Sequence, residues 1–188
     1  MRRTTKSQQV ARVLFSEAQL SAMVGRVARE IERDYRALGE PPVLLGVLNG
    51  SVVFLSDLMR ALEIPCDVDF VAVQSYRGER STGAPQLRLS PKTPLAGRHV
   101  LVVEDILDTG VTLSYLCREY LPQFDAASVK LCALLDKPSR RLPGAVCADY
   151  AGAVIPDLFV VGYGLDYDEA YRDLPYIGVL SGAPEHKE

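Results

Sequence analysis

Short apolar runs alternate along this chain with segments of helical periodicity. After a polar stretch at 1–9, Ser16 and Gln19 have the spacing of a capping box, and apolar residues then recur with a helical period up to Gly39. This pattern predicts an amphipathic helix that begins after Ser16. Further helical patterns are predicted at 52–62 and 112–121. The apolar runs predict strands at 43–48, 67–75, 100–103, 129–135, 154–161 and 176–180.

The order of these elements predicts an α/β fold. Strands that are apolar on both faces and separated by helices are typical of a mostly parallel sheet covered by helices on both sides. Two segments interrupt the alternation. The stretch 76–96 is long, polar and rich in glycine and proline, so we expect a functional loop there. From 162 onward, carboxylates and tyrosines surround a short strand, and we expect a small appendage beside the sheet.

Length and composition narrow the class of protein. The 188 residues fit one domain, here 1–188 with a core at about 12–161, and 48% hydrophobic with 24% charged residues is ordinary for a globular chain. No apolar run approaches the roughly 18–20 residues that cross a bilayer. A net charge of −3, from 21 Lys+Arg against 24 Asp+Glu, gives no basic excess for nucleic acid. We therefore expect neither a membrane nor a nucleic-acid partner.

The cysteines and histidines exclude some chemistry. The 4 Cys are scattered without a C-x-x-C pair, which favours reduced thiols and a cytoplasmic location. With only 2 His, one of them in the polar tail, the chain lacks material for a structural zinc site or a Ser-His-Asp triad.

The segment 100–112 carries the clearest chemical signal. Its apolar strand is followed by Glu104 and Asp105, at the strand end where open α/β sheets bind ligands. Neighbours on a strand point to opposite faces, so we expect the two acids to have separate tasks. The turn that begins at Asp108 then leads into a helix, where backbone N–H groups can hold a phosphate. By itself the turn could be a simple helix cap; it matches neither a Walker A loop nor a dinucleotide fingerprint.

Taken whole, 100–112 resembles the phosphoribosyl-pyrophosphate signature of the type I phosphoribosyltransferase family. The resemblance extends over nearly the whole chain after residue 12. The segments that resemble the hypoxanthine-guanine branch of this family are 47–51, 74–77, 135–141, 159–167 and 171–176. Of these, 135–141 and the carboxyl-terminal pair separate this branch from adenine and pyrimidine relatives.

The resemblance implies a fold, a reaction and an assembly. The fold is the type I phosphoribosyltransferase fold, with a small hood formed by terminal segments, to which about 162–188 contribute, and a mobile lid at about 76–96. The reaction converts phosphoribosyl pyrophosphate and a 6-oxopurine, hypoxanthine or guanine, to the nucleoside monophosphate and pyrophosphate, with Mg²⁺. A homodimer or homotetramer is implied as well.

The resemblance also implies roles for individual residues. Asp108 would be the general base that faces purine N7. Lys137 would donate to O6, Phe159 would stack on the base, and Val160 and Asp166 would present backbone atoms to it. Magnesium would be held by Glu104, Asp105 and Asp166. Phosphoribosyl pyrophosphate would be bound by Asn49, Gly50, Ser75, Tyr76, Glu104, Asp105, Asp108, Thr109, Gly110, Val111, Thr112 and Arg172.

One departure and two alternatives accompany this interpretation. The family commonly has lysine before the glycine of the pyrophosphate loop, where this chain has Asn49, so a positive charge at the leaving group is missing. Binding of the leaving group by backbone N–H groups, in a loop with a non-proline cis peptide, would not need this positive charge. The alternatives are a phosphoribosyl-pyrophosphate-sensing regulator on the same fold and a transferase for another base. The order of preference among hypoxanthine, guanine and xanthine stays open.

Overall fold

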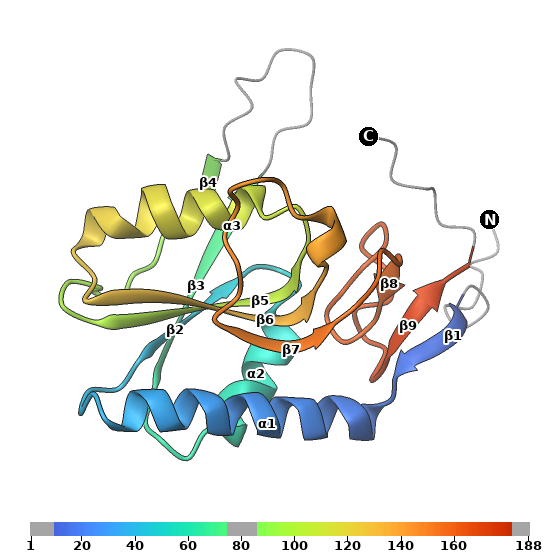
Figure 1. Ribbon diagram of the computed structural model, residues 1–188, viewed down its shortest axis with the longest axis horizontal. Coiled ribbons are helices and arrows are strands. Elements are labelled where there is room, and N and C mark those ends of the chain that lie inside the picture. The colour runs from blue at the N-terminus through green and yellow to red at the C-terminus, as the bar shows by residue number, and fades with distance from the viewer. Residues whose placement is uncertain (1–9, 75–85, 182–188) are drawn as a thin grey trace, which may run out of the picture.

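The computed structural model describes residues 10–74 and 86–181, which form a large and a small sheet. The large sheet has the strand order β4-β3-β2-β5-β6-β7 (Figure 1). Its pairs are parallel except for the edge pair of β3 and β4. The strands are β2 (Val43–Val47), β3 (Asp67–Gln74), β4 (Gln86–Leu89), β5 (His99–Leu107), β6 (Ser128–Asp136) and β7 (Tyr150–Val154). The predicted α/β fold with a mostly parallel sheet is confirmed.

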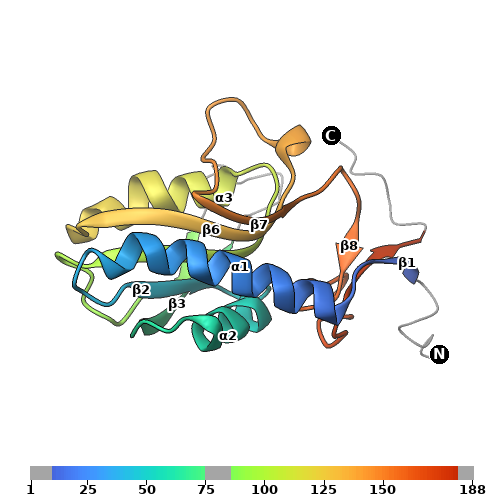
Figure 2. The same cartoon turned by 60° about the horizontal axis from the view of Figure 1, so that its bottom comes forward.

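Helices cover both faces of this sheet (Figures 1 and 2). One face packs against α1 (Glu17–Arg36) and α2 (Val52–Ala61), whose buried side chains meet those of Leu101 and Leu134. The other face packs against α3 (Val111–Tyr115), the π-helical turn η2 (Leu116–Tyr120) and the 3₁₀ turn η3 (Leu121–Phe124). Since both faces are covered, β2 is apolar along its whole length, and 100–103 of β5 and 131–135 of β6 are continuous apolar runs. Within the described ranges, no helix is both long enough and apolar enough to cross a membrane.

The predicted start of the first helix is confirmed in detail. The Ser16 side chain accepts a hydrogen bond from the Gln19 N–H, and the Gln19 side-chain oxygen accepts one from the Ser16 N–H at 2.9 Å. This reciprocal capping box satisfies two N–H groups that the first helical turn leaves without partners.

The small sheet is the hood, and it joins the two ends of the described chain. Its order is β1-β9-β8, all antiparallel, with β1 at Val10–Phe15, β8 at Val160–Val161 and β9 at Ile177–Leu180. It stands beside one end of the large sheet (Figures 1 and 2). The expected hood of terminal segments is confirmed, but strand β1 was not predicted.

Two predictions from local pattern were wrong. The single strand at 154–161 is divided between β7 in the large sheet and β8 in the hood, and Pro156 between them has no N–H for a ladder. The stretch 76–96 is not loop throughout, because β4 pairs with β3 from Ala72↔Leu89 to Gln74↔Gln86. Residues 75–85, which include the first part of the proposed lid at 76–85, lie outside the described residues.

Two other elements have different bounds from those predicted. Strand β5 continues to Leu107, so both acids lie within the strand and not after it. The helix predicted at 112–121 is α-helical only from Val111 to Tyr115 and continues as η2 and η3. Pro122 stands in η3, where proline cannot donate a backbone hydrogen bond.

A polar network ties α1 to the sheet far from the chemical segment. Lys130 Nζ lies 3.3 Å from Asp34 Oδ2 and donates to the Tyr150 hydroxyl at 3.0 Å, and that hydroxyl donates to Asp34 at 2.7 Å. The hydrogen bond from Tyr150 lowers the pKa of Asp34, with Lys130 acting in the same direction and burial opposing both.

We expect Asp34→Asn to lower the free energy of unfolding by about 1 kcal/mol at pH 7, because a charge-assisted hydrogen bond at a part-exposed site is weakened. The folded-state pKa of Asp34 lies below that of the unfolded chain, so this contribution is present above the unfolded value and is lost as pH falls through the folded one. Urea denaturation at pH 7 and near pH 3 checks it. A difference between variant and wild type that is equal at both pH values would contradict the assignment to charge.

Candidate active site

A cavity of about 210 Å³ lies where the carboxyl ends of β5 and β6 meet the hood. It is lined by Asp105, Ile106, Asp108, Lys137, Phe159, Val160, Leu165 and Asp166. All of these except Ile106 and Leu165 were singled out from the sequence. Both missed residues are apolar neighbours of predicted ones, and only the folded chain shows that they line the cavity.

The two acids of β5 face opposite sides of the sheet, as expected. Asp105 lies against the loop between β2 and α2, where a Cβ added to Gly50 would lie 1.7 Å from its Oδ2. Val100 and Val102, which precede Glu104 at two-residue spacing and so share its side of the strand, pack in the core on the other face. The acids are therefore not a single acid/base dyad.

Both acids are held in conditions that disfavour their charge. Burial, and secondarily the nearby Asp105 carboxylate, raises the pKa of Glu104 well above its usual range. Burial raises the pKa of Asp105 to about 6; the Ile106 N–H and Arg172 oppose this shift, and Asp166 adds to it. Glu104 Oε2 is shielded from solvent and has no hydrogen-bond partner among the described residues. A cation or a ligand hydroxyl would supply what these carboxylates lack.

The loop after β2 is packed too tightly for larger residues. The peptide bond between Leu48 and Asn49 is cis, as the resemblance allowed. Gly50 approaches the hood as well, because a Cβ on Gly164 would lie 2.2 Å from the Gly50 carbonyl oxygen. The Ser51 hydroxyl donates to the Val47 carbonyl at 2.7 Å. Two glycines thus let this loop lie between Asp105 and the hood, while the Asn49 side chain is exposed.

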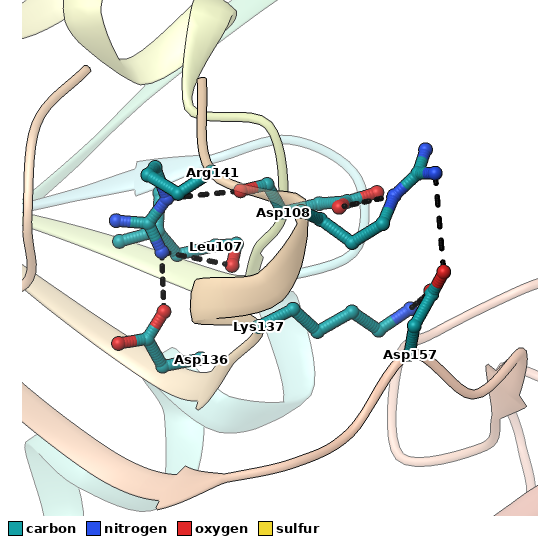
Figure 3. A network of polar contacts seen from close by, with 7 residues as sticks. Leu107, Asp108, Asp136, Lys137, Arg141 and Asp157 are labelled. Atoms are coloured by element: carbon teal, nitrogen blue, oxygen red, sulfur yellow. Dashed lines mark hydrogen bonds and ion pairs between the residues drawn. The ribbon is translucent and has the colours of Figure 1, made fainter. Parts of the chain in front are cut away.

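Positively and negatively charged side chains alternate at the end of the cavity that carries Asp108 and Lys137 (Figure 3). The Lys137 ammonium is 3.7 Å from Asp157 Oδ1, and Arg140 Nη1 is 3.9 Å from Asp157 Oδ2. Arg140 Nε donates to Asp108 Oδ1 at 3.2 Å. Neither Arg140 nor Asp157 was singled out from the sequence, although Arg140 stands in the matching segment 135–141.

Arg141 holds the backbone beside Asp108 (Figure 3). Its guanidinium donates to the carbonyl oxygens of Asp108 at 2.9 Å, Leu107 at 3.2 Å and Val146 at 2.6 Å, and it forms an ion pair with Asp136. It joins the end of β5 to the segment after β6. The Asp108 side chain therefore projects from a backbone that is fixed on both sides.

The remaining predicted residues lie around the cavity or outside the described chain. Gly110, with a φ of +79°, turns the chain into α3, and the Thr109 carbonyl accepts from the Leu142 N–H at 3.1 Å. Val111 and Thr112 form the first turn of α3 and do not line the cavity. Ser75 and Tyr76 lie outside the described residues.

Arg172 is beside the cavity and not in its lining. It pairs with Asp166 at 2.9 Å and with Glu169 at 3.1 Å, and it donates to the Gly164 carbonyl at 2.8 Å. It also borders a larger groove of about 660 Å³ between α1, α2 and the hood. A diphosphate at this position would compete with Asp166 and Glu169 for the guanidinium.

The donor set suits magnesium bound jointly with a ligand. Glu104, Asp105 and Asp166 supply the carboxylate oxygens that Mg²⁺ prefers, and the unpartnered Glu104 oxygen is consistent with an absent partner. In the part of the chain that the structure describes, no three His, Cys, Asp or Glu side chains converge to hold a metal alone. Substrate phosphates and water would have to complete the coordination.

Comparison with known proteins gives consistent matches. Residues 14–168 match the family model described as phosphoribosyl transferase domain. The chain is 42% identical over 172 residues to a hypoxanthine-guanine phosphoribosyltransferase of Streptococcus pneumoniae, covering 91% of this chain and 93% of that protein. It is 42% identical over 167 residues to a hypoxanthine phosphoribosyltransferase of Salmonella typhimurium, covering 88% and 93%. The crystal structure of a hypoxanthine phosphoribosyltransferase from Staphylococcus aureus matches with a TM-score of 0.87 and 38% identity, covering 96% and 97%.

Proposed function

This chain belongs to the phosphoribosyl transferase domain family, in its hypoxanthine-guanine branch, and we propose that it is a purine-salvage enzyme that makes IMP or GMP. It transfers the phosphoribosyl group of phosphoribosyl pyrophosphate to hypoxanthine or guanine. A bond forms between purine N9 and C1′ of the ribose, the bond from C1′ to the pyrophosphate oxygen breaks, and the proton on N7 passes to the enzyme.

The observation that carries this proposal is the cavity that joins Asp108, Lys137 and Phe159. Lys137 donates to O6 of the base, which an adenine amino group at the same place cannot accept in the same way. The Phe159 ring stacks on the purine, while the backbone of Val160 and Asp166 lines its edge. Asp108 then faces N7 as the general base, held in place by Arg140 and by the hydrogen bond that the Arg141 guanidinium donates to the Asp108 carbonyl.

The ribose and its phosphates occupy the side of the cavity toward β2 and α3. Glu104 and Asp105 hold the ribose hydroxyls, and the turn from Asp108 to Thr112 receives the 5′-phosphate at the start of α3. Gly50 and its neighbouring backbone approach the pyrophosphate without the usual lysine, and Arg172 supplies a positive charge. Magnesium, when bound with the substrate through Glu104, Asp105 and Asp166, offsets the charge of the leaving group.

The reacting carbon becomes cationic as the leaving group departs. Buried carboxylates near the ribose stabilise such a charge, which is why the position of Asp105 beside Gly50 matters for the rate. The intact base cavity also favours the transferase over a regulator that only senses phosphoribosyl pyrophosphate, because a sensor has no use for Lys137 and Phe159.

The decisive experiment is steady-state kinetics with phosphoribosyl pyrophosphate, magnesium and each of four bases: hypoxanthine, guanine, xanthine and adenine. We expect kcat/KM for hypoxanthine or guanine to exceed that for adenine by at least about 10²-fold, because adenine leaves the Lys137 donor unmatched in a buried site. Chelation of magnesium is expected to abolish turnover. Equal or better turnover of adenine would refute the assignment of the base.

A further inference from the structure

Lys137, the proposed donor to the base, has its counter-ion Asp157 outside the cavity lining. Lys137 is buried, with 3% of its surface exposed, and its ammonium lies 3.7 Å from Asp157 Oδ1. Asp157 does not line the cavity, and 43% of its side chain is exposed. A buried ammonium is costly without a compensating charge. Asp157, on the bend between β7 and β8, supplies that charge without lining the cavity.

Asp157 also lies near a second cation, Arg140, which contacts the proposed general base Asp108. Its Oδ2 is 3.9 Å from Arg140 Nη1, and Arg140 Nε donates to Asp108 at 3.2 Å. Two cations and two carboxylates therefore alternate from Lys137 to Asp108, with no net charge. The neighbouring charges are paired separately: Arg141 with Asp136, and Arg172 with Asp166 and Glu169. Asp105, which also lines the cavity, is a buried carboxyl group and brings no positive charge to it.

We propose that Asp157 is a specificity-determining residue, because it neutralises the Lys137 and Arg140 end of the cavity and so favours neutral 6-oxopurines over anionic ones. This inference rests on the proposed function and concerns the preference that the sequence leaves open. A neutral base needs only a donor at O6. Xanthine, which ionises near neutral pH, would gain from a surplus of positive charge, and Asp157 removes that surplus.

The test is Asp157→Asn, which removes the charge and keeps the shape. At pH 8 the ratio of kcat/KM for hypoxanthine to that for xanthine is expected to fall about tenfold, mainly through a lower KM for xanthine. Asp157 touches no reacting atom, so kcat with hypoxanthine should change much less than this ratio. At pH 6, where xanthine is mostly neutral, the fall should be much smaller. Asp157→Ser is expected to behave alike, and Asp157→Glu to keep the wild-type ratio.

Two further variants separate local charge from total charge. Asp125→Asn changes the net charge equally at the C-cap of η3, near Gly97 and far from the cavity, and should leave the ratio unchanged. Adding Arg140→Gln to Asp157→Asn restores zero net charge to the chain of side chains. The double variant is expected to recover discrimination against xanthine, although its kcat should be lower because Arg140 contacts Asp108.

The outcomes for the two proposals are distinct. If the wild type turns over no 6-oxopurine, the proposed function fails and this inference fails with it. If the wild type is active but Asp157→Asn keeps the same ratio, only this inference is overturned. An equal loss with hypoxanthine and xanthine, without dependence on pH, would likewise overturn it and would indicate a purely structural role for Asp157.

Discussion

Replacing Asp108 with asparagine is expected to lower kcat by about 10²–10⁴-fold while leaving the affinity for phosphoribosyl pyrophosphate nearly unchanged. The amide has the shape of the carboxylate but cannot take the N7 proton. The backbone at this position is held by Arg141 through the Asp108 carbonyl, which the substitution keeps, so the turn toward α3 should remain in place.

Steady-state kinetics and calorimetric titration with phosphoribosyl pyrophosphate and magnesium measure the two quantities separately. Asp168→Asn is the matched control, because Asp168 is an exposed carboxylate of the hood with a φ of +52° that asparagine tolerates, and it lies outside the cavity lining. It should retain wild-type kcat. An Asp108→Asn enzyme with full kcat and a raised KM would show that Asp108 only binds substrate.

Gly50→Ala is expected to lower kcat/KM for phosphoribosyl pyrophosphate by about 10²-fold or more. The new Cβ would lie 1.7 Å from Asp105 Oδ2 and 2.6 Å from its Cγ, so either the carboxylate or the loop must move. A displacement on the order of 1 Å in a site that orients reacting groups can cost about this much. The substitution should disturb the contacts of both the ribose and the leaving group, since Gly50 lies between Asp105 and the hood.

Gly25→Ala in α1 is the control for this substitution. A Cβ there meets the Arg29 guanidinium at 3.6 Å, an ordinary contact, and alanine favours a helix. That variant should keep full activity and at least wild-type thermal stability. If Gly50→Ala has unchanged kcat/KM and an unchanged melting temperature, the loop tolerates a side chain and its proposed role is wrong.

Much of the fold depends on relationships between residues that are close in the chain, and these could be predicted. The capping box at Ser16 depends on a spacing of three residues, and the buried strands are continuous apolar runs because helices cover both faces of the sheet. The chemical segment is also contiguous. Glu104, Asp105 and Asp108 stand within one strand end and one turn, so their chemistry is visible before the fold is known.

The tertiary structure decided what depends on distant partners. Strand β1 exists because β9, about 165 residues later, offers it an edge, and β4 exists because β3 does. The roles of Asp157 and Arg140 arise in the same way, from a bend between the two sheets that brings one carboxylate to two cations. The local pattern around Asp157 carries no sign of this. Charge compensation depends on distance in space, and the path of the chain between β7 and β8 sets that distance.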